Sequence, residues 1–144
     1  MNLNVRGLAV GPSLPGSAPA ALALLGDVVV LFVFVAMGIS NHGGAPLESP
    51  MYTLERLAPF VLSWVVVAPL AGVYHRETLT EYRRTVVLVV VTWVVAALGG
   101  SALRGSALFP GGAPLAFVLV TLSFGTAMVL AWRVAGVWVR RQVG

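Results

Sequence analysis

The sequence predicts an all-α, polytopic membrane protein with four transmembrane helices arranged as two hairpins, and composition and segment length are the observations that predict it. Of the 144 residues, 58% are hydrophobic and only 10% are charged. A soluble domain carries about one quarter charged residues, so this chain lacks the polar surface of a water-soluble globule. Because a membrane-crossing helix needs ~20 apolar residues, the chain has room for about four crossings of a cell membrane.

Residues 1–19 are rich in Gly, Pro and Ser around Arg6, which indicates a flexible cytoplasmic N-terminal segment. The transmembrane domain is expected over residues 20–140. Its first span covers residues 20–40 and ends at a polar turn that begins with Asn41. No small-residue cleavage pattern follows this span, so we interpret it as a retained helix and not as a secretory signal peptide.

The second span, residues 50–74, begins at Ser49-Pro50, a cap residue followed by a proline in the first turn. Two internal prolines, Pro59 and Pro69, predict a kink in it. A charged and therefore aqueous connection, residues 75–84, leads to the third span, residues 85–103. The fourth span, residues 114–139, ends in Arg140 and Arg141.

The placement of arginine predicts the orientation of the helices. All nine basic residues are arginine, and the net charge is +4. One side of the predicted bundle holds Arg6, Arg76, Arg83, Arg84, Arg140 and Arg141, and the other holds Arg56 and Arg104. Because cytoplasmic loops carry the excess of positive charge, both termini are expected in the cytoplasm. Arginines at the ends of apolar runs contact lipid headgroups, so the expected partner is the lipid bilayer and not nucleic acid.

A possible internal duplication appears at an offset of 68 residues. At this offset residues 43–47 fall on residues 111–115, and residues 61–64 fall on residues 129–132. Chance identity in a chain of this composition and a true repeat both remain open. A true repeat predicts that the two turns superpose and that Trp64 lies over Trp132.

Asp27 and Arg133 are the predicted intramembrane ion pair. Asp27 lies about seven residues inside the first span, which is ~10 Å deep at 1.5 Å per residue, and Arg133 lies at nearly the same depth in the fourth. An ionised carboxylate at this depth costs several kcal/mol unless it is paired or wet. The pair is interpreted as a structural link between helices, with a proton-linked or ion-linked site as the alternative.

Two further candidate sites are weaker. His42, Glu55 and Arg104 lie at the outer ends of the spans and form a candidate outer-face polar site, for which membrane anchoring is the simpler explanation. Trp64 and Trp93 lie inside spans and are candidates for the wall of a cavity that binds an apolar ligand, although core packing also explains them.

Several chemistries are disfavoured by what the sequence lacks. There is no cysteine, the two histidines have no metal-ligand spacing, and no phosphate-binding glycine loop, nucleophile elbow or metalloprotease motif is found. We therefore expect no enzymatic activity, no cofactor and no metal.

Several short motifs are spread along the chain. They are Gly26-Asp27, Asn41-His42-Gly43, Pro59-Phe60 with Trp64, Gly72-Val73-Tyr74, Leu108-Phe109 with Gly111-Gly112, and Trp132-Arg133. Together they resemble a family of small prokaryotic membrane proteins of unknown function, DUF3054. The resemblance covers about residues 22–137 and implies a four-helix membrane protein without an assigned activity.

Three functions remain as hypotheses. The first is an accessory or interaction subunit that packs in a membrane assembly, as a homo-oligomer or with another membrane protein. The second is a small oligomeric proton-linked transporter that uses Asp27, an analogy that rests on topology alone. The third is a membrane protein that binds an apolar ligand or a lipid.

Overall fold

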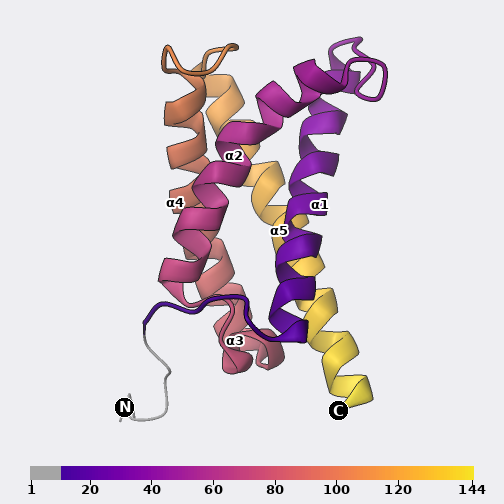
Figure 1. The fold of residues 1–144 in the computed structure, drawn as a ribbon, viewed down its shortest axis with the longest axis vertical. Helices are drawn as coiled ribbons and strands as arrows, with labels where there is room; N and C mark the ends of the chain where they lie inside the picture. Colours follow the sequence, from indigo (N-terminus) through magenta and orange to yellow (C-terminus); the bar gives the residue numbers. More distant parts are fainter. Residues whose placement is uncertain (1–10) are drawn as a thin grey trace.

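The structure is a computed structural model that describes residues 11–144. The regular secondary structure in this range is helical, and four of the helices are long and apolar enough to cross a membrane (Figure 1). The helices are α1 (Ala18–Asn41), α2 (Pro50–Ala71), α3 (Arg76–Thr80), α4 (Tyr82–Arg104) and α5 (Leu115–Val143). The four expected spans therefore correspond to α1, α2, α4 and α5, with ends that differ by at most four residues.

Local signals explain where α1 and α2 begin and end. The hydroxyl of Ser17 accepts a hydrogen bond from the backbone N–H of Ala20 at 3.2 Å, which caps the first turn of α1. Ser49 precedes α2, but its hydroxyl makes no such bond. Gly72 ends α2 with a left-handed backbone (φ 79°), a conformation that glycine adopts without strain. The sequence-based end at Tyr74 was therefore three residues too late.

Prolines and a short helix shape the middle of the chain. Pro59 and Pro69 both lie within α2, and the helix changes direction along its length in Figure 1. A proline removes one intrahelical hydrogen bond and crowds the preceding turn, which accounts for the bend. The charged connection between α2 and α4 contains the short helix α3.

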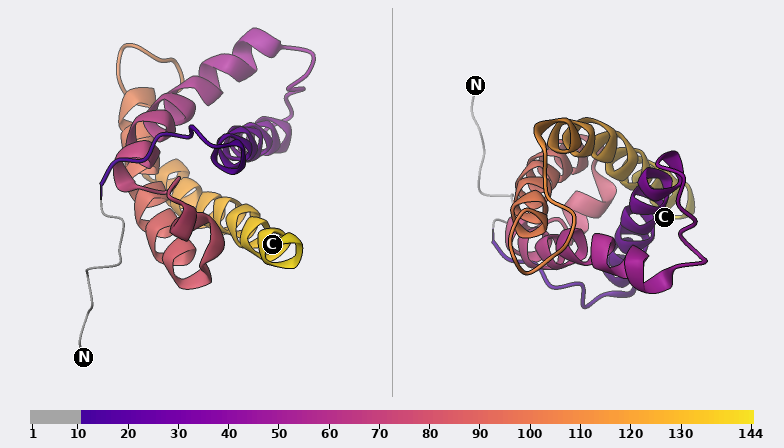
Figure 2. Two further views of the ribbon diagram at one scale, coloured as in Figure 1. Left: turned by 60° about the horizontal axis from the view of Figure 1, so that its bottom comes forward. Right: turned by 90° about the horizontal axis from the view of Figure 1, so that it is seen from above.

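The four long helices form a closed ring in the order α1, α2, α4, α5, because α1 also packs against α5 (Figure 2). The centre of the ring is aromatic. Trp64 of α2 and Trp93 of α4 pack with ring centroids 6.1 Å apart, and Phe60 packs beside them against Phe34 of α1. On the outside, many large aliphatic side chains are exposed, as expected for helices that face lipid.

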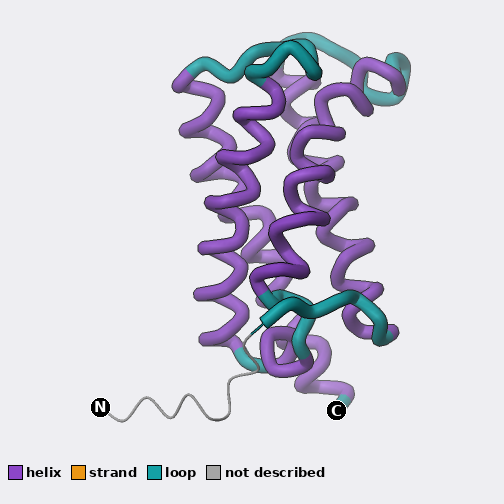
Figure 3. Tube along the Cα trace, turned by 60° about the vertical axis from the view of Figure 1, so that its left-hand side comes forward, coloured by secondary structure: helices purple, strands orange, loops and turns teal. Residues whose placement is uncertain are grey.

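The loops gather at the two ends of the bundle (Figure 3). We call the end with the connections 42–49 and 105–114 the loop end, and the end with residues 11–17, α3 and the C-terminus the terminal end. The expected flexible segment, residues 1–19, falls partly outside the described residues. Its described part is fixed to the bundle by hydrogen bonds of Ser13. The backbone N–H of Ser13 donates to the backbone oxygen of Pro69 at 2.8 Å, and the Ser13 hydroxyl accepts from the backbone N–H of Tyr74 at 3.0 Å.

The two turns related by the 68-residue offset have different backbones. Gly112 has a positive φ (63°), whereas the corresponding Gly44 does not. In addition, α5 begins at Leu115, but the corresponding Leu47 still lies in a turn before α2. The prediction that these turns superpose is therefore wrong, because the first connection needs three more residues before its helix can start.

Candidate functional site

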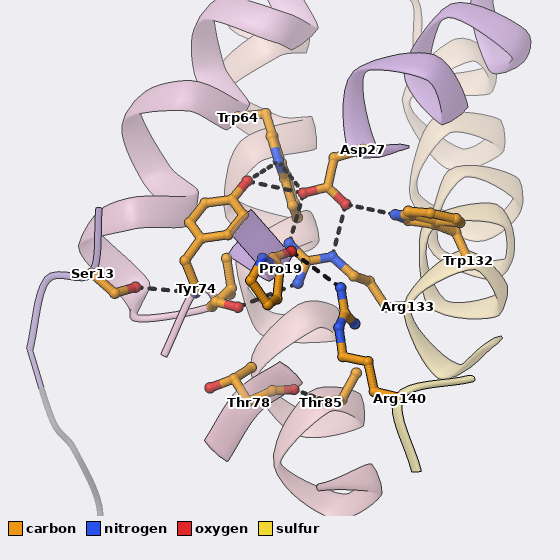
Figure 4. Close-up of polar contacts among 11 residues, drawn as sticks. Ser13, Pro19, Asp27, Trp64, Tyr74, Thr78, Thr85, Trp132, Arg133 and Arg140 are labelled. Atoms are coloured by element: carbon orange, nitrogen blue, oxygen red, sulfur yellow. Dashed lines mark hydrogen bonds and ion pairs between the residues drawn. The ribbon is translucent and has the colours of Figure 1, made fainter. Parts of the chain in front are cut away.

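The structure brings Asp27 and Arg133 together in a buried, two-pronged ion pair (Figure 4). Nε of Arg133 donates to Oδ1 of Asp27 at 2.7 Å, and Nη2 donates to Oδ2 at 2.6 Å. Only 1% of Asp27 and 2% of Arg133 is exposed. Two parallel hydrogen bonds of this kind fix the geometry of both side chains as well as neutralising their charges.

Three aromatic side chains complete the hydrogen bonding of the Asp27 carboxylate. Oδ2 also accepts from the hydroxyl of Tyr74 at 2.9 Å and from Nε1 of Trp64 at 3.1 Å, and Oδ1 accepts from Nε1 of Trp132 at 3.1 Å. We call Asp27, Trp64, Tyr74, Trp132 and Arg133 the Asp27 cluster. A carboxylate offers about four lone-pair positions, so five donors leave no free acceptor position on Asp27.

The Asp27 cluster ties three parts of the chain to α1. Its donors come from α2, from the turn after α2, and from α5. Arg133 extends the cluster through Nη1, which donates to the backbone oxygen of Val73 at 3.2 Å. Burial, together with the negative charge of Asp27, raises the pKa of Tyr74, so its hydroxyl stays protonated and keeps donating.

Close packing around Trp132 depends on the absence of a side chain at Gly26. A Cβ atom at this position would lie 1.8 Å from Cζ2 of Trp132. Gly26 therefore lets the indole approach α1 closely, with its N–H donating to the neighbouring residue Asp27. The same relation holds between Gly125 and Trp93, where an added Cβ would lie 2.4 Å from the indole ring.

A second feature is a cavity of about 760 Å³ at the loop end, which we call the loop-end cavity. It lies between α1, α2 and α5, and in Figure 1 α1 and α5 cross near the terminal end and separate toward the loop end. Its walls are mainly apolar and include Phe34, Phe60, Phe117, Val120 and Phe124. Cavities of this size and character are typical of sites for small molecules or lipid chains.

The candidate outer-face polar residues divide between the cavity and the surface. His42 and Arg104 line the loop-end cavity, whereas Glu55 is exposed and does not. Among residues 11–144 the ion pair of Asp27 and Arg133 is the only one, so no charge pair joins Glu55 to Arg104. The neighbouring Arg56 lines the cavity instead, since the turn of the helix directs position 56 inward and position 55 outward.

The structure does not place Trp64 and Trp93 in the wall of a cavity. Both are buried in the centre of the ring, with at most 1% of either exposed. Trp64 belongs to the Asp27 cluster, and Nε1 of Trp93 donates to the backbone oxygen of Thr121 at 3.2 Å. The cavity lies nearer the loop end, where α1 and α5 are further apart.

Sequence reasoning missed Trp64, Tyr74 and Trp132 as partners of Asp27, and it missed Arg56 as a cavity residue. The 68-residue offset that aligns Trp64 with Trp132 was a signal for both tryptophans. No periodic signal was available for Tyr74, because it lies in an irregular turn beyond α2. In the described part of the chain, no three His, Asp or Glu side chains are grouped so that they could hold a metal ion.

Four apolar helices around a buried polar cluster define the chain as a multi-pass, helical membrane protein. The family model described as "Protein of unknown function (DUF3054)" matches residues 24–136, which is most of the chain. The protein therefore belongs to this family, and the matched region includes every residue of the Asp27 cluster. No curated protein and no solved structure matches the chain.

Proposed function

We propose that this protein binds the apolar part of a lipid-like ligand in the loop-end cavity, a non-catalytic role. The observation that carries the proposal is the cavity itself, about 760 Å³ between three membrane helices with aromatic and aliphatic walls. Ligand sites in proteins are usually concave and apolar, with a few polar groups that orient the ligand. Here the polar groups that line the cavity include His42, Arg56 and Arg104.

The separation of α1 and α5 gives such a ligand a route from the membrane. Val120 and Phe124 line the cavity from α5 and are about half exposed. Met37 of α1 also lines the cavity and is 41% exposed. An acyl chain can therefore pass between the two helices while it remains in apolar surroundings throughout, so entry does not require exposure to water.

The Asp27 cluster supports a structural role and not a transport role for Asp27. Its carboxylate is almost fully buried, accepts five hydrogen bonds, and does not line the loop-end cavity. A transport site needs a carboxylate that exchanges its partners during the cycle, and a saturated, close-packed carboxylate opposes this exchange. In this proposal the cluster clamps the helices at the terminal end, so that they can diverge at the loop end.

A role as an accessory subunit in a membrane assembly, in a homo-oligomer or with another protein, is compatible with ligand binding. The outer face of α4 carries exposed valines, including Val87, Val91 and Val95. Such a face is suited equally to lipid and to a neighbouring helix. Purification in lipid nanodiscs, followed by identification of the proteins that accompany the chain, tests this role separately.

The ligand proposal is tested by filling the cavity. Val120→Trp adds a large side chain to the cavity wall, and Val91→Trp adds the same side chain to a residue of α4 outside the lining; the two valines are 55% and 57% exposed. Native mass spectrometry of the protein with a bacterial total lipid extract should show one retained lipid in the wild type and in Val91→Trp, and none in Val120→Trp. Equal retention in the two variants would contradict the proposal.

A further inference from the structure

The loop-end cavity contains two arginines and no acidic residue among the described residues that line it. Arg56 comes from α2 and Arg104 is the last residue of α4, so the two cations approach the cavity from different helices. Both line the same cavity, so their positive charges oppose each other there. Two like charges beside apolar walls are costly unless an anion lies between them.

The hydrogen bonding of Arg56 is incomplete. Its guanidinium carbon lies 3.8 Å from the centre of the Tyr52 ring, so the face of the guanidinium is covered by an aromatic side chain. Its Nη1 atom, however, is buried and has no hydrogen-bond partner in residues 11–144. A donor atom that is shielded from water and lacks a partner is costly, and it marks a position where an acceptor from outside the chain fits.

Arg104 is held in place by the loop before α5. Its Nε donates to the backbone oxygen of Gly112 at 2.8 Å, and its guanidinium carbon lies 4.2 Å from the centre of the Phe117 ring. Gly111 (φ 121°) permits this arrangement, because a Cβ atom there would lie 3.1–3.2 Å from the guanidinium group. Arg104 is therefore a pre-oriented cation, and it uses only part of its set of five donors.

From these contacts we propose that the cavity is a site for an anionic phospholipid, with the lipid phosphate between Arg56 and Arg104 and an acyl chain along the wall formed by Phe117, Val120 and Phe124. This inference rests on the proposed function and adds the chemistry of the headgroup. Guanidinium groups bind phosphate through paired hydrogen bonds, and the apolar wall beside them matches an amphiphile better than a free anion. Cavity residues on α1 and α5 that are partly exposed, Met37, Val120 and Phe124, favour a membrane lipid as the source.

The test compares phosphatidylglycerol with phosphatidylcholine in detergent titrations followed by native mass spectrometry. The wild type should bind phosphatidylglycerol more tightly, because the choline cation of phosphatidylcholine offsets its phosphate charge. Arg56→Gln should weaken the binding of phosphatidylglycerol by about tenfold and that of phosphatidylcholine by less. Arg76→Gln removes the same charge from an exposed residue at the terminal end and should have no effect. If Arg56→Gln does not fold, Arg56→Lys takes its place. This variant keeps the charge without the paired donors, so we expect an intermediate loss of affinity for phosphatidylglycerol.

Four outcomes would overturn the inference. These are an equal affinity of the wild type for the two lipids, an equal effect of Arg56→Gln and Arg76→Gln, full competition by inorganic phosphate, and a dimer of the chain that occupies the cavity in place of lipid. If Val120→Trp abolishes lipid retention but the headgroup has no influence, the headgroup assignment fails and the proposed function stands. If Val120→Trp has no effect, the proposed function itself fails.

Discussion

Trp64 and Trp132 lie on different helices, 68 positions apart in the sequence, and donate to opposite oxygens of the same carboxylate at 3.1 Å each. Asp27 thus lies between two indole N–H groups, and Arg133 donates to both of its oxygens. A buried tryptophan usually directs its N–H to a polar partner, and here two tryptophans share the same partner, the Asp27 carboxylate. The cluster consequently sets the distance between α1, α2 and α5 at the terminal end.

The first prediction concerns the ion pair. Asp27→Asn and Arg133→Gln should each lower the free energy of unfolding by about 3–5 kcal/mol, since each leaves a buried partner uncompensated. The double variant should lose less than the sum of the two, because neither charge then remains alone. Denaturant unfolding in mixed micelles gives the free energy of unfolding of the wild type, the two single variants and the double variant.

The same variants distinguish a structural role of Asp27 from a role in proton transport. If Asp27 served proton transport, Asp27→Asn would keep a stable, correctly assembled protein and would abolish proton-driven flux in liposomes. Unchanged stability in Asp27→Asn would therefore count against the structural role of the pair.

The second prediction tests the close approach of α1 to Trp132. Gly26→Ala should destabilise the protein by about 1–3 kcal/mol, because the added Cβ overlaps the indole ring. Gly38→Ala is the matched control on the same helix, where an added Cβ meets nothing within 4 Å and helix propensity improves. Near-ultraviolet circular dichroism should report the displaced tryptophan in Gly26→Ala only. A similar stability in the two variants would show that Trp132 does not pack here.

The third prediction concerns pH. Because burial and Asp27 raise the pKa of Tyr74 in the folded state, ionisation at alkaline pH favours the unfolded state. The stability from the protonated hydroxyl is fully present below about pH 10 and is lost as the pH rises toward the folded-state pKa. Tyr74→Phe should therefore be less stable than the wild type at about pH 8, by roughly 1.5–3 kcal/mol, and the difference should shrink above about pH 10. A difference that stays constant from about pH 8 to about pH 11 would refute this role of Tyr74.

The parts of this structure that follow a regular period were predictable, and the parts that depend on the path of a turn were not. Apolar segment length located all four long helices, and similar depth in two spans was enough to pair Asp27 with Arg133. The position of Tyr74 depends on the left-handed residue Gly72, which redirects the chain after α2. The loop-end cavity depends on the angles between helices, which side-chain packing sets and hydropathy does not encode. Trp64 and Trp93 lie in the packed core, which is one of the two explanations that the sequence left open for them.

The fourth prediction is the orientation of the bundle. The chain has no cysteine, so single cysteines can be introduced without a background. Leu47→Cys and Leu108→Cys lie at exposed positions of the loop end, and Arg76→Cys lies at an exposed position of the terminal end. In intact cells a membrane-impermeant maleimide should label the first two and not the third, because the terminal end carries the larger share of arginines. Labelling of positions 47 and 76 from the same side would rule out a membrane crossing by α2.

The central claim is that the loop-end cavity holds a lipid acyl chain, and photocrosslinking tests it most directly. Phosphatidylglycerol with a diazirine group in one acyl chain is incorporated into nanodiscs with the wild-type protein, and the labelled residues are mapped by peptide mass spectrometry. We predict that crosslinks concentrate between Phe117 and Phe124 of α5 and between Phe34 and Gly38 of α1, and that Val120→Trp removes them. Crosslinks spread evenly over the lipid-facing surface, with the valines of α4 labelled as strongly as the cavity residues, would contradict the claim.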